Sequence, residues 1–102
     1  FCWAAAEGDV AEMRRLVARG ISPDVGDYDG RTALHLAACE GRVAALRYLI
    51  GLGVNLNSVD RWGNTPLDDA IRENQNQSHK PIIAVLSEHG AKQKNTVPSA
   101  AT

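Results

Sequence analysis

A repeat of 33 residues constrains this chain more than any other feature of its sequence. Residues 4–21 align without a gap with residues 37–54 when the chain is shifted by 33 positions, and the same shift places Asp27 on Asp60 and Thr32 on Thr65. Repeats of this length fold as units that pack on their neighbours in a row. The 102 residues therefore predict one small, elongated all-α domain with a thin core.

The period divides the chain into units with the following predicted boundaries. A partial first unit spans 1–26, a second 27–59 and a third 60–92, and residues 93–102 form a flexible tail without periodicity. Phe1 falls on Leu34, so the turn and helix cap of the first unit would precede Phe1. We therefore expect the parent protein to continue upstream.

The third unit differs from the second by four extra residues. Its second helix matches only after a shift of 37, which indicates an insertion at 74–77. One interpretation is a slightly longer first helix or surface loop, which tolerates insertions. The other is a polar ledge that contacts a partner.

Capping residues mark where the first helix of each unit begins. Thr32 and Thr65 are good N-caps, and His35 and Asp68, three residues later, can return a bond to the cap. Asp68 and Asp69 are adjacent and point about 100° apart on a helix, so they form no catalytic dyad. We expect one to cap the helix and the other to face solvent.

Small and large apolar residues divide the packing between the two helices of each unit. The alanines that let first helices approach closely are Ala4, Ala5, Ala37, Ala38 and Ala70. Helical spacing predicts a second-helix core of Met13, Leu16, Val17, Leu46, Leu49, Ile50, Ile83 and Leu86. Gly20, Gly53 and Gly90 follow these helices and suit a left-handed C-terminal cap.

Two stretches carry a family resemblance. "GRTALHLAACEG" and "GNTPLDDA" resemble the ankyrin motif, commonly G-x-T-P-L-H-x-A-A, and the likeness extends over residues 1–92. It implies an ankyrin-repeat solenoid with β-hairpin-like tips. More narrowly, "DYDGRTALHLAACEG" with "DRWGNTPLDDA" is similar to the ankyrin tails of animal glutaminases and the ankyrin segments of plant ankyrin-kinases.

Charge and hydropathy argue against several classes of partner. Eleven Lys and Arg against twelve Asp and Glu give a net charge of -1, without a basic stripe for nucleic acid. Apolar runs fall short of the roughly 20 residues needed for membrane insertion. Each unit uses its glycines at turns and caps, so no phosphate-binding loop or cofactor is expected.

Catalysis and metal binding are also not expected. His35 and Cys39 share one helix face, but zinc needs further ligands at matching spacing, and a nucleophilic pair needs an orienting acid. We interpret His35 as a capping residue. Cys2 and Cys39 are too few for a disulfide framework and are expected to be free thiols in a reducing, intracellular compartment.

Residues that the repeat leaves free are the candidates for binding. In the ankyrin family these are the tips and the concave face of the first helices. The resemblance transfers them to Tyr28, Asp29, Arg31, Cys39, Glu40, Arg61, Trp62, Asn64, Arg72 and Glu73, with Ala6 and Glu7 beside them. Tyr, Trp and Arg are enriched in binding hot spots. The alternative is that Tyr28 and Trp62 brace neighbouring tips.

The sequence therefore predicts a non-catalytic protein–protein interaction module within a larger protein. Its partner would be another protein or another domain of the same polypeptide, in the cytoplasm. The narrower resemblance implies an alternative, a C-terminal assembly or regulatory tail of a glutaminase-like or kinase-like enzyme. Such a tail would allow a homo-oligomer through the parent protein, and a mitochondrial location if the parent is glutaminase-like.

Overall fold

The computed structural model describes residues 1–74 and 78–92, and its elements are all helices. The first unit contains α1 (Cys2–Glu7) and α2 (Val10–Ala18), the second α3 (Ala33–Glu40) and α4 (Val43–Gly51), and the third α5 (Pro66–Arg72) and α6 (Lys80–Glu88). The all-α prediction is confirmed. Most of the predicted insertion and the whole predicted tail lie outside the described residues.

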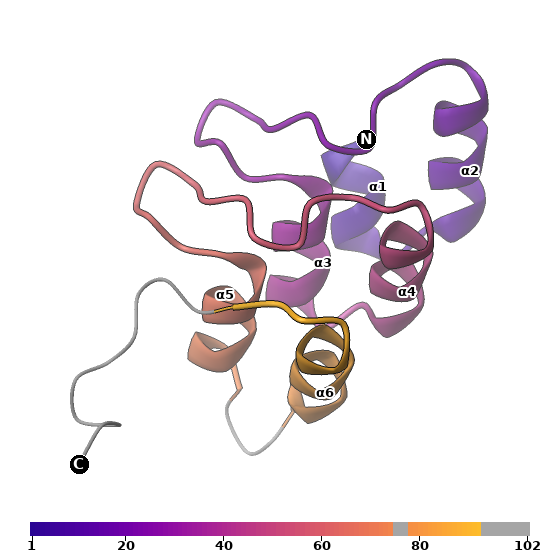
Figure 1. The fold of residues 1–102 in the computed structure, drawn as a ribbon. Helices are drawn as coiled ribbons and strands as arrows, with labels where there is room; N and C mark the ends of the chain where they lie inside the picture. The colour runs from indigo at the N-terminus through magenta and orange to yellow at the C-terminus, as the bar shows by residue number, and fades with distance from the viewer. Residues whose placement is uncertain (75–77, 93–102) are drawn as a thin grey trace, which may run out of the picture.

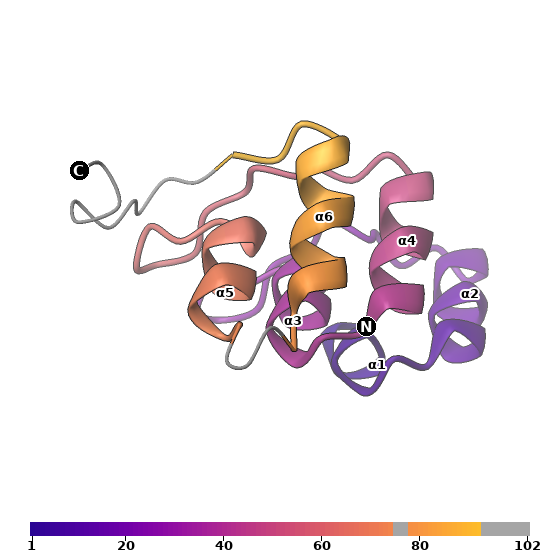
Figure 2. The same ribbon diagram turned by 90° about the horizontal axis from the view of Figure 1, so that it is seen from below.

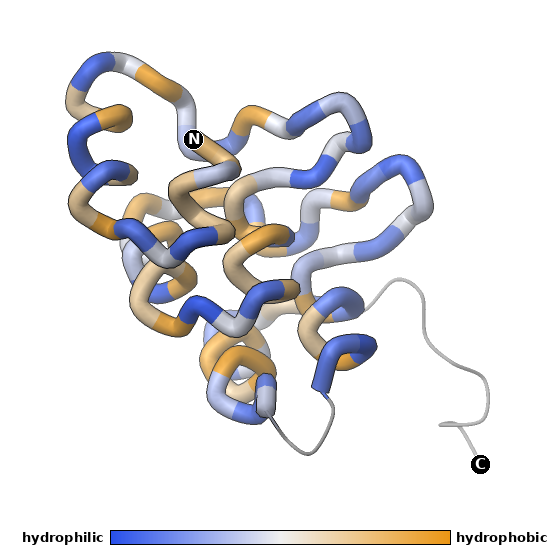
Figure 3. Tube along the Cα trace, turned by 180° about the vertical axis from the view of Figure 1, so that it is seen from behind, coloured by the Kyte–Doolittle hydropathy of each residue, from blue (hydrophilic) through white to orange (hydrophobic). Residues whose placement is uncertain are grey.

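The helices form two layers (Figures 1 and 2). The first helices α1, α3 and α5 pack side by side in one layer, and the second helices α2, α4 and α6 line up in the other. The connections between units project together from one edge of the stack, and Figure 3 shows them as mainly hydrophilic. We call these projecting connections the tips.

Both predicted capping boxes are present. Thr32 Oγ1 accepts the backbone N–H of His35 at 3.4 Å, and His35 Nδ1 accepts the backbone N–H of Thr32 at 3.2 Å. Thr65 and Asp68 form the same reciprocal pair at 3.2 and 2.9 Å. Each pair satisfies backbone donors that the first turn of a helix would otherwise leave without partners.

Matching hydrogen bonds shape the two described tips and join them. Asp27 Oδ1 accepts the backbone N–H groups of Asp29 and Arg31, and Asp60 Oδ1 accepts those of the residues two and four positions later. The backbone N–H of Arg61 also donates to the carbonyl oxygen of Asp29 at 2.8 Å. Neighbouring tips are therefore held in register by their backbones.

The core follows the expected division, with four residues less buried than predicted. The five predicted alanines are buried, and so are Met13, Leu46, Leu49 and Leu86 of the second helices. The other predicted core residues, Leu16, Val17, Ile50 and Ile83, are only partly buried. Leu16 and Val17 belong to the first unit, which packs on one other unit among the described residues. The buried Ile82 and Val85 were not predicted.

The extra residues of the third unit do not lengthen its first helix. By the 33-residue alignment, α5 ends at Arg72 one position earlier than α3 ends at Glu40. Of the longer helix and the loop, the two forms of that interpretation, the longer helix is not observed, and the connection from α5 to α6 carries the added length. Asn74 lies in that connection, and its Oδ1 accepts the backbone N–H of His79 at 2.9 Å.

Candidate functional site

The tips present aromatic side chains beside an arginine. Tyr28 is fully exposed, and Trp62 is 58% exposed. The Arg61 guanidinium lies 5.5 Å from the centroid of the Trp62 ring, and its Nη1 lies 3.2 Å from Asp29 Oδ1 in the neighbouring tip. Arg61 thus joins two tips through both its backbone and its side chain. We call Tyr28, Arg61 and Trp62 the tip patch.

Two other predicted residues meet on the first-helix layer around a buried carboxylate. Arg31 Nη2, from the turn before α3, lies 3.6 Å from Asp69 Oδ2, and Arg72 Nη2, one turn along α5, lies 3.1 Å from Asp69 Oδ1. Cys39, on α3, is a partly buried free thiol. We call Arg31 and Arg72 the arginine pair.

The burial of Asp69 corrects the expectation that one of the two adjacent aspartates faces solvent. Asp68, which caps the helix, is 7% exposed, and Asp69 is 1% exposed. Asp69 is buried because its helix face turns towards the preceding unit, from which Arg31 reaches across. Its two oxygens lie at ion-pair distances from the arginine pair, but no contact among the described residues meets hydrogen-bond geometry.

The surroundings of Asp69 perturb its protonation. Burial is the main cause that raises the pKa of Asp69 above its usual value, and the Asp60 carboxylate acts in the same direction. Arg72, His35 and Arg31 lower the pKa, but they do not fully offset burial. The carboxylate therefore binds a proton more tightly in the folded protein than in the unfolded chain.

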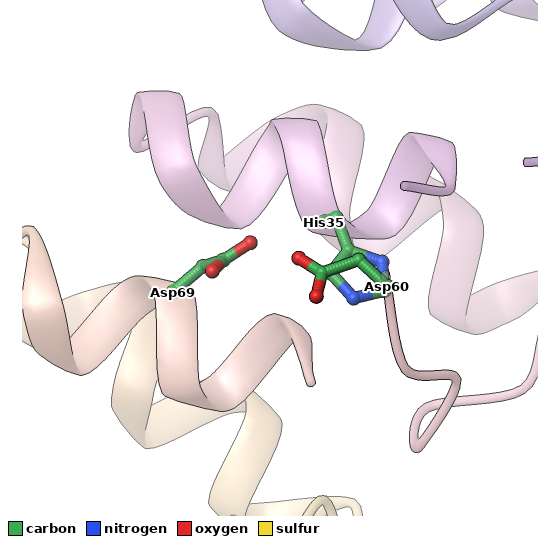
Figure 4. Close-up of side chains that lie close together, drawn as sticks. All are labelled: His35, Asp60 and Asp69. Carbon is green, nitrogen blue, oxygen red and sulfur yellow. The ribbon is translucent and has the colours of Figure 1, made fainter. Parts of the chain in front are cut away.

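His35, Asp60 and Asp69 bring ligand-type atoms within 4.8 Å of one another (Figure 4). His35 is fully buried, and both of its ring nitrogens are already engaged: Nδ1 accepts from Thr32, and Nε2 lies 2.8 Å from the Asn64 carbonyl oxygen. Because a carbonyl only accepts, Nε2 carries the proton. Both ring nitrogens are therefore committed to the fold, and neither is available to a metal ion.

The remaining predicted residues serve different roles. The Asn64 carbonyl oxygen also accepts the backbone N–H of Asp60, so this residue holds the tip on α3. Glu73 Oε2 lies 3.3 Å from Arg72 Nε, and Glu40 and Glu7 are exposed. The Ala6 carbonyl oxygen accepts a hydrogen bond from Arg42.

Sequence reasoning missed the exposed Trp3. Its side chain on α1 is 67% exposed, at the position that Leu36 and Asp69 occupy in the next two units. The repeat alignment could have indicated this residue, because it places a large aromatic side chain on the outer side of the first unit. Cys2 lies beside it with a free thiol whose pKa is raised mainly by burial.

Membrane insertion finds no support in the described helices. None of them combines the length and the apolar character that crossing a bilayer requires.

Comparison with known proteins agrees with this geometry. The family model for ankyrin repeats matches residues 1–97 in three copies. The human ASB11 ankyrin repeat domain superimposes with a TM-score of 0.79 and 31% identity, over 89% of this chain and 39% of that one.

Sequence relatives include two plant potassium channels. Potassium channel SKOR from Arabidopsis thaliana is 38% identical over 98 residues, or 96% of this chain and 11% of the channel. Potassium channel KOR2 from Oryza sativa subsp. japonica is 50% identical over 34 residues, or 33% of this chain and 5% of the channel. The chain thus spans about a tenth or less of each channel. With three matched copies over most of its length, this chain belongs to the ankyrin-repeat family.

Proposed function

We propose that this chain is a non-catalytic protein-interaction module that binds its partner through the tip patch and the exposed side of the first helices. Ankyrin repeats mediate protein–protein binding, which is the general function of the family. The observation that carries the proposal is the exposure of Tyr28 and Trp62 beside Arg61. Large aromatic residues and arginine supply most of the binding energy at protein interfaces.

The predicted contact residues differ in how exposed their side chains are and in how many contacts they make within the fold. Tyr28, Arg61 and Trp62 have largely exposed side chains and form the centre of the proposed contact surface. Asp29, Arg31, Cys39, Glu40, Asn64, Arg72 and Glu73 surround this centre in our proposal. Asn64 acts mainly through the tip backbone that it holds.

The chemistry of the tip patch indicates the kind of partner. A guanidinium stacked on an indole ring offers N–H donors at its edge and an apolar face beside them. A partner segment with carboxylates among apolar side chains complements such a surface. Asp29 already pairs with Arg61 at 3.2 Å, but a surface ion pair of this kind is weak and exchangeable.

The test compares a tip variant with a matched arginine variant on the other layer. The tip variant, Arg61→Ala with Trp62→Ala, removes two side chains of the tip patch, whereas Arg47→Ala removes an exposed arginine of α4. Proteins that the native chain retains from a cell extract are compared with those retained by each variant. Some proteins will be retained by the native chain and by Arg47→Ala but not by the tip variant. Each of these is purified, and its affinity for all three chains is measured.

We expect the tip variant to bind such a partner at least about tenfold more weakly, which corresponds to about 1.4 kcal/mol. Its circular dichroism should stay native-like, because the removed side chains are largely exposed. Unfolding of the tip variant would identify Trp62 as a brace. A folded variant that binds normally would place the contact surface elsewhere, with residues 74–77 as the next candidate.

A second candidate is a regulatory or assembly module within a larger protein, including one that forms oligomers. It is supported by SKOR, where the region similar to this chain makes up 11% of the channel. Because SKOR is a channel, this similarity supports a module within a larger protein and does not point to an enzyme as that protein. Reading the coding sequence upstream of Phe1 tests it: a pore or catalytic domain supports this candidate, and further ankyrin units favour a scaffold.

A further inference from the structure

Asp69 occupies a position that the other two units fill with apolar side chains. The equivalent residues are Trp3 on α1 and Leu36 on α3. Asp69 is 1% exposed, and neither of its oxygens makes a hydrogen bond with a described residue. Burying a carboxylate costs desolvation free energy, and its two arginine partners are exposed enough to be solvated without it. The ankyrin stack therefore does not require a carboxylate here.

What Asp69 does is bring two cations together on the exposed side of the first helices. Arg31 belongs to the second unit and Arg72 to the third, and both direct Nη2 at this one carboxylate, at 3.6 and 3.1 Å. The side chains are 25% and 51% exposed, so their outer edges remain accessible. A guanidinium has five N–H donors, and one nitrogen of each faces Asp69.

The charges around the arginine pair select the kind of anion that fits. Glu73 lies 3.3 Å from Arg72 Nε, in a largely exposed contact between adjacent residues that a ligand can displace. A carboxylate oxygen of Asp60 lies within 4.8 Å of one of Asp69, and Glu40 is exposed at the end of α3. These acidic neighbours repel a dianion such as phosphate more strongly than a singly charged carboxylate, which needs only the outer N–H groups of the two guanidiniums.

We propose that the arginine pair, positioned by Asp69, is a receptor for a carboxylate side chain of the protein partner. This inference rests on the proposed function as an interaction module and names one part of its contact surface. Asp69 is a positioning residue in this scheme: it holds two guanidiniums from different units at the spacing that a carboxylate bridges. Preorganised donors of this kind bind an anion without first giving up side-chain freedom.

The experiment uses nuclear magnetic resonance of the arginine Nε–H groups in the 102-residue chain. The probe is a short synthetic peptide with the central sequence Glu-Phe-Glu, and its control carries Gln-Phe-Gln. The variants are Asp69→Leu, which installs the residue used in the second unit, and the isosteric Asp69→Asn. Arg15→Ala is the matched control, because Arg15 forms an ion pair with Glu12 on α2, away from the arginine pair.

Support would be a saturable shift of the Arg31 and Arg72 signals with the glutamate peptide but not with the glutamine peptide. Both Asp69 variants should bind at least fivefold more weakly, while Arg15→Ala binds normally. Asp69→Leu should melt at the same temperature as the native chain or higher, a result that a purely structural role would not give.

Four results would each overturn the receptor. These are an absent shift at the arginine pair, unchanged affinity in the Asp69 variants, tighter saturation by inorganic phosphate than by the peptide, and a strong loss of stability in Asp69→Leu. If the peptide shifts only the Arg61 signal, the receptor fails while the interaction module stands. The module itself is judged separately, by the tip-variant comparison.

Discussion

Replacing His35 with asparagine should separate the cap of α3 from the link between the second and third units. The imidazole does both: Nδ1 accepts the Thr32 backbone N–H at 3.2 Å, and Nε2 donates to the Asn64 carbonyl oxygen at 2.8 Å. An asparagine Oδ1 can still accept from Thr32 in the way that Asp68 accepts from Thr65. Its shorter side chain does not reach the carbonyl of the next unit.

The structure sets the expected size of the effect. A lost hydrogen bond removes about 1 kcal/mol, and the Asn64 carbonyl oxygen keeps the Asp60 N–H at 3.0 Å, so it is not left unpaired. Lost imidazole packing adds about 1 kcal/mol. His35→Asn should therefore lower the free energy of unfolding by about 2 kcal/mol. His35→Ala also strips the buried Thr32 N–H of its acceptor and should lower it by about 4 kcal/mol.

Urea unfolding followed by far-ultraviolet circular dichroism measures both variants. The alanine value is a large part of the roughly 5–15 kcal/mol that stabilises a typical domain, so its transition should move visibly towards zero denaturant. Equal losses in the asparagine and alanine variants would show that the cap contributes nothing. A loss below about 0.5 kcal/mol in His35→Asn would refute the link between units.

Three further changes test other features. Gly41→Ala should lower the stability of the fold more than Gly53→Ala. Both sites have a left-handed φ, near 74° and 80°, but only at Gly41 would the added methyl group meet a neighbour, His79 Nε2 at 3.3 Å. The urea midpoint of unfolding should therefore be lower for Gly41→Ala. The raised pKa of Asp69 means that stability falls as pH rises from the unfolded value of 3.8 through the folded pKa; a parallel fall in Asp69→Asn would contradict this. Met13→Ala, at a fully buried site, should lower the unfolding free energy by about 2–5 kcal/mol in the same assay.

Features that depend on local spacing were predictable from the sequence. The Thr32 and Thr65 caps and the left-handed glycines Gly20, Gly53 and Gly90 follow from residues only a few positions apart, and all are confirmed. The buried alanines follow from periodicity, because the repeat assigns the same face of every first helix to its neighbours.

Features that depend on a neighbouring unit were not predictable in the same way. Helical geometry separates Asp68 from Asp69, but burial of Asp69 depends on Arg31 of the preceding unit. In α6 the buried face also includes Ile82 and Val85, and Ile82 corresponds to the buried Ala45 of α4 in the 37-residue alignment. The candidate surface was located from the family resemblance, whereas the convergence of two of its arginines on one carboxylate depends on side-chain reach in three dimensions.

The layering of the helices also determines how the chain folds. The main helix contacts join units that follow one another in the sequence, such as α1 with α3 and α3 with α5, so folding closes loops of about one repeat and none that spans the whole chain. Chains with mainly local contacts cross a low entropic barrier and fold quickly. Among the described residues, only the middle unit has a neighbour on both sides, and in the 102-residue chain it should form the nucleus from which order spreads. Hydrogen exchange should then be slowest in α3 and faster towards α1 and α6.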